Sequence, residues 1–160
     1  MYIWFIIALI VILDRVSKII VQNNMQIGES IGVIPGFFHI TYILNSGAAF
    51  GMLSGKRWFF IIISLIVIGG IIFFLNKVPK EHRAIRFCMG LIGGGALGNM
   101  YDRIFIGQVV DFLDFRVWPE VWSYIFNIAD SSLVVGSILL AWLIYKQPDS
   151  ISTRIESNNP

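Results

Sequence analysis

WFFIIISLIVIGGIIFFL, residues 58–75, is an apolar run that contains no charged side chain. A helix of this length rises about 27 Å, at roughly 1.5 Å per residue, which approaches the thickness of the hydrocarbon core of a bilayer. The backbone groups of a segment at that depth have no water partner and must be satisfied within the helix itself. The run therefore predicts a transmembrane helix.

Three further segments, residues 2–21, 84–104 and 127–145, are also long and apolar enough to cross a bilayer. The composition agrees, because 56% of the 160 residues are hydrophobic, only 14% are charged, and the mean hydropathy is +0.76. These values exclude an ordinary soluble domain, and the length excludes a large transporter. No positive charge precedes the first run, and charged residues interrupt its far end, so we expect a retained helix rather than a cleaved signal sequence.

The orientation follows from the loop between the second and third predicted helices. Residues 76–86 contain the densest group of basic side chains, Lys77, Lys80, Arg83 and Arg86. Short basic loops remain in the cytoplasm. Lys56 and Arg57 in another loop oppose this assignment but are fewer. We therefore expect a multi-pass membrane protein with both termini in the cytoplasm.

Two stretches on the extracytoplasmic side lack the helical pattern. Residues 37–44, FFHITYIL, are rich in the aromatic and β-branched residues that suit a strand, and residues 113–125 are predicted to form a lid-like loop. We expect an integral membrane, mainly α fold: four transmembrane helices with a small β-sheet cradle and the lid-like loop at the extracytoplasmic face. Residues 1–146 would form a single domain, and residues 147–160 a polar cytoplasmic tail.

Polar side chains gather at the extracytoplasmic ends of the predicted helices and in the loops between them. They are Asp14, Lys18, Asn45, Asn99, Asp102, Arg103, Asp111, Asn127 and Asp130. Within each helix their spacing is i, i+3 or i, i+4, which places them on one face. Charged groups at a membrane boundary are costly and usually mark function. Two nearby acids that cannot both ionise easily can act as acid and base, so Asp111 and Asp130 are the candidate pair.

Each polar set also has a purely structural explanation. Asp14 and Lys18 could form an ordinary i, i+4 ion pair near an interface. Asn127 could be a helix N-cap, with Asp130 a first-turn acid that the helix dipole favours. A lone acid such as Asp111 could be a simple loop residue.

Other kinds of site are not favoured. Gly90, Gly94 and Gly98 form overlapping G-x-x-x-G steps, which predict close helix packing and not phosphate binding. The net charge of +2, without a basic run, gives no reason to expect a nucleic-acid partner. His39 and His82 are predicted on opposite membrane sides, and the chain has 1 cysteine, so we expect no metal and no cofactor.

Five short motifs occur in order along the chain: DRVSK at 14–18, NSGAAF at 45–50, GALGNMYDR at 95–103, VVDF at 109–112 and FNIAD at 126–130. Each is weak alone, but in this order and with four predicted helices the chain resembles bacterial lipoprotein signal peptidase, the signal peptidase II family of aspartic peptidases. Met100 and Tyr101 depart from the aliphatic pair that is commoner there.

The resemblance implies a membrane aspartic endopeptidase that cleaves the signal peptide from diacylglyceryl-modified prolipoproteins, on the N-terminal side of the lipidated cysteine. It implies that Asp111 and Asp130 activate water as a catalytic pair. It also implies a set of substrate-binding or site-supporting residues: Asp14, Lys18, Asn45, Gly47, Asn99, Asp102, Arg103, Asn127 and Ala129. The partners would be lipidated prolipoproteins and membrane lipid, and the enzyme would be a monomer with its active site near the extracytoplasmic face.

Two other classes of function stay open on the residues alone. Intramembrane acids also serve proton-coupled transporters, and Asn99-x-x-Asp102 with Asn127-x-x-Asp130 is a weak internal echo. Against a transporter, the acids gather at one face and do not form a chain across the bilayer. Glycine-rich helices would also suit a non-catalytic membrane scaffold. Cleavage of a lipidated precursor in detergent, without an ion gradient, would separate an enzyme from both.

Overall fold

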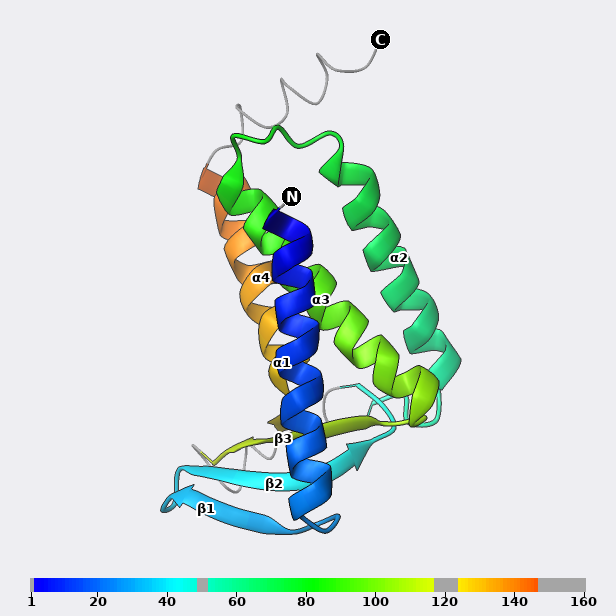
Figure 1. Ribbon diagram of the computed structural model, residues 1–160, viewed down its shortest axis with the longest axis vertical. Coiled ribbons are helices and arrows are strands. Elements are labelled where there is room, and N and C mark those ends of the chain that lie inside the picture. The colour runs from blue at the N-terminus through cyan, green and yellow to red at the C-terminus, as the bar shows by residue number, and fades with distance from the viewer. Residues whose placement is uncertain (1, 49–51, 117–123, 147–160) are drawn as a thin grey trace.

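The computed structural model describes residues 2–48, 52–116 and 124–146. Its helices are α1 (Tyr2–Asn24), α2 (Arg57–Leu75), α3 (Arg83–Phe105) and α4 (Ile128–Lys146). Its strands are β1 (Ser30–Ile34), β2 (Phe38–Asn45), β3 (Val109–Phe115) and β4 (Ile125–Phe126). The helices run along the long axis, and the sheet crosses the end of the bundle that lies away from the start of α1 (Figure 1).

The predicted helices are present in the described residues, with ends within a few residues of those expected. Two of them, α2 and α4, are long and apolar enough to span a membrane. Charged side chains interrupt α1, and α3 is rich in glycine and polar residues. A count of four membrane spans therefore stays a prediction.

The surface of the bundle is apolar and much of its interior is polar. Phe5, Trp58 and Ile138 are 69%, 70% and 64% exposed. In contrast, Lys18 and Asp102 are completely buried. Soluble proteins rarely bury charged side chains completely while exposing so many large apolar side chains. This arrangement suits a protein whose helices are surrounded by lipid.

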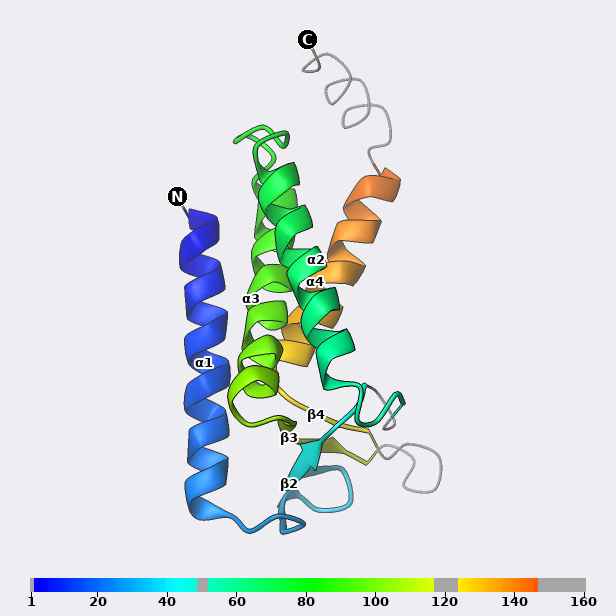
Figure 2. The same cartoon turned by 90° about the vertical axis from the view of Figure 1, so that its right-hand side faces the viewer.

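Helix α3 lies between α1 and α4 (Figure 2). The glycine stripe faces α1: a Cβ on Gly90 would lie 2.9 Å from Cγ2 of Ile6, and one on Gly94 would lie 2.7 Å from Cβ of Ile10. On the neighbouring face, a Cβ on Gly95 would collide with the backbone oxygen of Ala129 in α4. The prediction that these glycines serve close helix packing is confirmed.

The antiparallel sheet has the order β1-β2-β3-β4. The predicted strand is confirmed as β2, and it pairs with β3 so that Ile43 lies opposite Asp111. We expected Asp111 in a loop, and this was wrong: VVDFLDF, residues 109–115, forms β3, because its β-branched and aromatic side chains suit a buried strand. Residues 113–115 of the predicted lid belong to β3, and residues 117–123 lie outside the described residues.

Candidate active site

Asp111 is completely buried in β3, at the end of the sheet that meets the helices. Its two carboxylate oxygens accept hydrogen bonds from different elements. Nδ2 of Asn127 donates to Oδ1 at 2.6 Å, and Nδ2 of Asn45 donates to Oδ2 at 2.9 Å. Asn45 is the last residue of β2, so the strand pairing brings it to Asp111.

Asp130 lies in the first turn of α4 and is held by a different pair of donors. Nδ2 of Asn99 in α3 donates to its Oδ1 at 2.7 Å. The backbone N–H of Asn127 donates to its Oδ2 at 3.4 Å, and the Asp130 N–H donates to Oδ1 of Asn127 at 2.8 Å. Asn127 is thus the N-cap of α4, as the structural explanation of the Asn127–Asp130 spacing predicted. It also hydrogen-bonds to both acids, so the N-cap of α4 lies within the candidate site.

Both acids line one cavity of about 220 Å³ at the sheet end of the bundle. Its polar walls include Asn45, Gly47, Asn99, Arg103 and Tyr124. The opposite walls are apolar and come from α2 and α4, with Phe60, Ile63, Val67 and Leu133 among them. The cavity therefore places two carboxylates between a polar side and an apolar side.

Arg103 joins two walls of this cavity. Its guanidinium donates to the backbone oxygen of Gly47 at 3.1 Å and lies 4.7 Å from the centre of the Phe60 ring. A planar guanidinium suits both contacts, because its edge donates hydrogen bonds while its face stacks on a ring. Arg103 thereby fixes the loop after β2 against α2 and α3.

The electrostatics of the cavity favour a carboxyl group that holds its proton. Burial, followed by the charge of Asp130, raises the pKa of Asp111 to about 7. The hydrogen bonds from Asn45 and Asn127 act in the opposite direction. Burial and both acids also raise the pKa of Tyr124, so its phenol remains protonated at neutral pH.

A buried ion cluster lies behind the two acids. Nζ of Lys18 is 2.8 Å from Oδ2 of Asp14 and 2.8 Å from Oδ2 of Asp102, and all three side chains are completely buried. Arg15 also pairs with Asp102, and Lys18 donates to Oδ1 of Asn99 at 3.4 Å. Asp14 and Lys18 do form the i, i+4 ion pair that was the structural explanation for these residues. The pair is buried inside the bundle, however, and Lys18 connects it to Asn99 of the candidate site.

The same cluster holds the backbone immediately before each acid. Oδ1 of Asp14 accepts the N–H of Ala129 at 3.0 Å, next to Asp130. Oδ2 of Asp102 accepts the N–H of Val110 at 3.2 Å, next to Asp111. Because Lys18 pairs with both Asp14 and Asp102, one cation links the supports of both acids.

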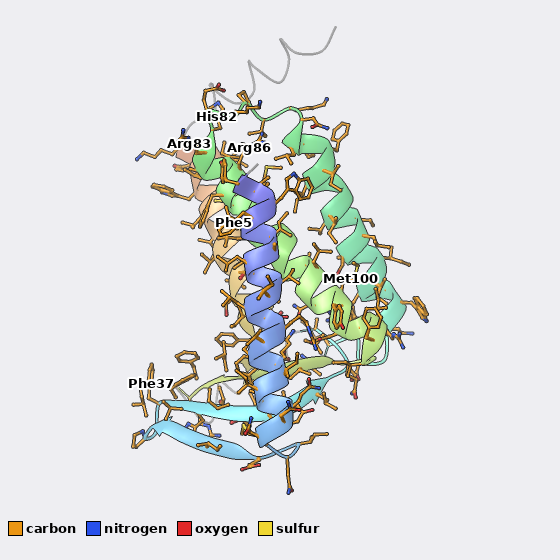
Figure 3. The ribbon with its side chains drawn as sticks, viewed as in Figure 1. Phe5, Phe37, His82, Arg83, Arg86 and Met100 are labelled. Atoms are coloured by element: carbon orange, nitrogen blue, oxygen red, sulfur yellow. The ribbon has the colours of Figure 1, made fainter. Side chains whose placement is uncertain are left out.

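No group of three or more His, Cys, Asp or Glu side chains that could hold a metal ion occurs within 2–48, 52–116 and 124–146. His82 lies at the end of the bundle away from the sheet (Figure 3), whereas His39 belongs to β2. The carboxylates of the cavity instead have amide donors and one another's charge as their surroundings.

A family model described as signal peptidase (SPase) II matches residues 6–146. The chain belongs to the signal peptidase II family. It is 53% identical over 144 residues to the lipoprotein signal peptidase of Desulfitobacterium hafniense, covering 90% of this chain and 93% of that protein. It is 42% identical over 154 residues to that of Listeria monocytogenes, covering 96% and 98%. The family membership inferred from the five motifs is confirmed.

Two solved structures share the fold of this chain. Both are described as bacterial membrane enzyme structures obtained by the in meso method. The first has a TM-score of 0.86 and 40% identity, and the match covers 93% of this chain and 90% of that one. The second has a TM-score of 0.81 and 41% identity, covering 89% and 92%. These likenesses support a membrane protein with the mainly helical, small-sheet architecture.

All the predicted site residues of this chain lie in or directly behind the cavity. Those that line it are Asn45, Gly47, Asn99, Arg103, Asp111 and Asp130. Those behind it are Asp14, Lys18, Asp102, Asn127 and Ala129. Tyr124 was not among the predicted site residues, but it belongs to the segment 113–125 that was expected as a lid, and it lines the cavity. Phe60 also lines the cavity, and nothing in the sequence singled it out within its apolar run.

Proposed function

We propose that this member of the signal peptidase II family cleaves the signal peptide from diacylglyceryl-modified prolipoproteins, on the N-terminal side of the lipidated cysteine, with Asp111 and Asp130 as the catalytic pair. One observation carries the proposal. Two acids from different elements, the buried Asp111 and the half-buried Asp130, open onto one cavity, and a single residue, Asn127, hydrogen-bonds to both. Family membership supplies the reaction class, and the acids supply its chemistry.

The chemistry needs one carboxylate and one carboxyl group. The carboxylate takes a proton from water, and the hydroxide attacks the carbonyl carbon of the scissile bond. The carboxyl group protonates the leaving nitrogen as the C–N bond breaks, which yields a new carboxylate and the free amine of the lipidated cysteine. The pKa of about 7 for Asp111 supports a pair that shares one proton near neutral pH. The pair titrates as a unit, so the roles are not divided between its members.

The walls of the cavity suit an extended, partly apolar substrate. Amide groups of Asn45 and Asn99 lie beside the acids, on the side from which a peptide backbone would be bound. The apolar wall from α2 and α4 faces the other side, where it would contact small apolar side chains or lipid chains. The guanidinium of Arg103 keeps the Gly47 loop at the cavity edge.

The enzyme would work as a monomer in the bacterial plasma membrane, with both termini in the cytoplasm and the cavity near the extracytoplasmic face. The basic loop between α2 and α3 supports this orientation, because it lies at the end of the bundle away from the sheet (Figure 1). The four helices would then all cross the bilayer, with the charges of α1 and α3 hidden in the buried cluster.

The test is cleavage of a purified diacylglyceryl-modified prolipoprotein in neutral detergent, without an ion gradient. We expect Asp111→Asn and Asp130→Asn each to lower the rate by about 10²–10⁴-fold, because each removes one member of the acid–base pair. Asp114→Asn is the matched control, since Asp114 is a buried acid on the same strand that pairs with Arg116 outside the cavity.

The outcome against the dyad is substantial cleavage by either variant when its unfolding temperature equals that of the wild type. A rate unaffected by a chelating agent would agree with a reaction that runs on carboxylates alone. Absence of cleavage by the wild-type protein, together with gradient-driven uptake in vesicles, would instead favour a transporter.

A further inference from the structure

A second hollow lies at the end of the bundle away from the sheet, far from the proposed active site. It has a volume of about 670 Å³ and is lined by Tyr2, Lys80, Arg83, Ala84, Arg86 and Phe87. Half of its lining residues are cations and none is an acid. Figure 3 shows Arg83 and Arg86 beside the start of α1, with Phe5 further along that helix.

The cations of this hollow have little of their charge neutralised by the protein. Within the described part of the chain, no carboxylate forms an ion pair with Lys80, Arg83 or Arg86. Nη1 of Arg86 donates to the backbone oxygens of Leu75 and Val78, at 3.0 and 2.8 Å. These bonds hold Arg86 at the end of α2 and leave its other guanidinium N–H groups for an outside acceptor.

The side of the hollow toward the bundle is apolar and accessible. Phe87 is 43% exposed, and Phe5 lies one turn beyond Tyr2 on α1 with most of its ring uncovered. The Tyr2 hydroxyl donates to the backbone oxygen of Arg83 at 2.8 Å, which ties the start of α1 to the start of α3. The hollow thus combines three cations with the aromatic side chains of Tyr2 and Phe87, here called the aromatic floor, and the exposed Phe5 continues this apolar surface along α1.

We propose that this hollow binds the headgroup of an anionic phospholipid, with the lipid chains along Phe5 and Phe87. Guanidinium groups bind phosphate oxygens through paired hydrogen bonds, and basic pockets at the end of membrane helices hold anionic headgroups. The aromatic floor distinguishes a lipid from a soluble phosphate, because only a lipid gains from apolar contact as well as from charge. This site is separate from the catalytic cavity, so it stands or falls independently of the proposed reaction.

The test measures lipid retention by the full chain in neutral detergent, using native mass spectrometry. Phosphatidylglycerol, phosphatidylcholine with the same chains, and glycerol 3-phosphate are the three probes. We expect one phosphatidylglycerol to be retained in preference to the other two. Each juxtamembrane cation contributes about fivefold to such binding, so Lys80→Gln with Arg83→Gln should weaken retention by about 25-fold.

The matched control is Lys77→Gln with Lys146→Gln. These lysines lie at the same end of the bundle, but their ammonium groups sit over the rings of Phe73 and Trp142 and do not line the hollow. The control pair removes the same charge and should change retention by less than about threefold. Unfolding temperatures in the same detergent should match for both pairs, because all four side chains lie at the ends of the bundle.

Two results would overturn the proposal. Equal weakening by the two double variants would show that the cations attract anionic lipid only as a diffuse surface charge. Binding of glycerol 3-phosphate as tight as that of phosphatidylglycerol would show a site for soluble anions with no part for the aromatic floor. Phe87→Ala checks that floor directly, since it should lower phosphatidylglycerol retention without altering any charge.

Discussion

Replacing Lys18 with methionine should damage both the stability and the activity of the protein. The substitution keeps the length and the apolar stem of the side chain but removes the cation that pairs with both Asp14 and Asp102. At 2.8 Å, each ion pair is worth about 6 kcal/mol at an effective dielectric constant of about 20, before desolvation is subtracted. Leaving buried partners unpaired costs about 3–5 kcal/mol, which is the loss of unfolding free energy that we expect.

Asp14→Asn should be milder than Lys18→Met. Its amide oxygen can still accept the Ala129 N–H, and Lys18 keeps its pair with Asp102. The measurement is denaturant unfolding in detergent together with the rate of precursor cleavage. Lys77→Met is the control for introducing methionine, because Lys77 is not in the buried cluster.

A free energy of unfolding of Lys18→Met within about 1 kcal/mol of the wild-type value would contradict a stabilising role for this cation. So would a double variant, Asp14→Asn with Lys18→Met, whose loss of unfolding free energy equals the sum of the two single losses, since contacting residues of one network should couple. An unchanged cleavage rate in a destabilised Lys18→Met protein would show that the cluster supports the fold but not the position of the acids.

Three further outcomes follow from the site and the bundle. A Cβ on Gly98 would lie 2.8 Å from Oδ2 of Asp14, so Gly98→Ala should cost about 1–3 kcal/mol in unfolding measurements and slow cleavage, whereas Gly69→Ala, with no atom within 4 Å, should do neither. The folded state holds the pKa of Asp111 above its ordinary value of 3.8, so the contribution of Asp111 to stability is greatest below about pH 4 and is lost as the pH rises toward 7. When the free energy of unfolding is measured against pH, its slope over this range should be flatter for Asp111→Asn than for the wild type, and identical slopes would contradict this. In intact cells, a membrane-impermeant maleimide should label Val33→Cys, which lies in the sheet on the proposed outer side, and should not label Lys80→Cys in the proposed cytoplasmic loop. The buried Cys88 should give little background, and the reverse labelling pattern would invert the proposed orientation.

The helices were predictable from the sequence, because long apolar runs have few alternatives to a helix in lipid. The strand β2 was predictable from its aromatic and β-branched residues. Strand β3 was not recognised, because two acids interrupt its apolar residues and a pattern of charge at that spacing suits an outer loop equally well. Its identity as a strand depends on pairing with β2, which residue types alone do not specify.

That the motif residues would gather around one cavity was predictable, but the connections among them were not, and their roles in a reaction stay a prediction. The spacing of Asp14 and Lys18 indicated a shared face, yet it did not show that the pair is buried or that Asp102 joins it. The contacts to the Ala129 and Val110 N–H groups involve backbone donors, which every residue has, so no residue type marks them. Asn127 was weighed as either a cap or a site residue, whereas the structure shows it both capping α4 and donating to Asp111.

The hydrogen bond from the Val110 N–H to Asp102 restricts the number of residues that can connect α3 to β3. The identities of the side chains do not reveal this restriction. Because Asp102, in the last turn of α3, is hydrogen-bonded to Val110, residues 103–109 must span a fixed distance. Asp111 directly follows Val110, so its position depends on the length of this segment. Ile104 and Phe105 within it are well exposed and can be exchanged for other apolar residues. Adding or deleting a single residue there would leave every polar side chain of the cavity in the sequence. It would nevertheless shift Asp111 away from its position opposite Asp130.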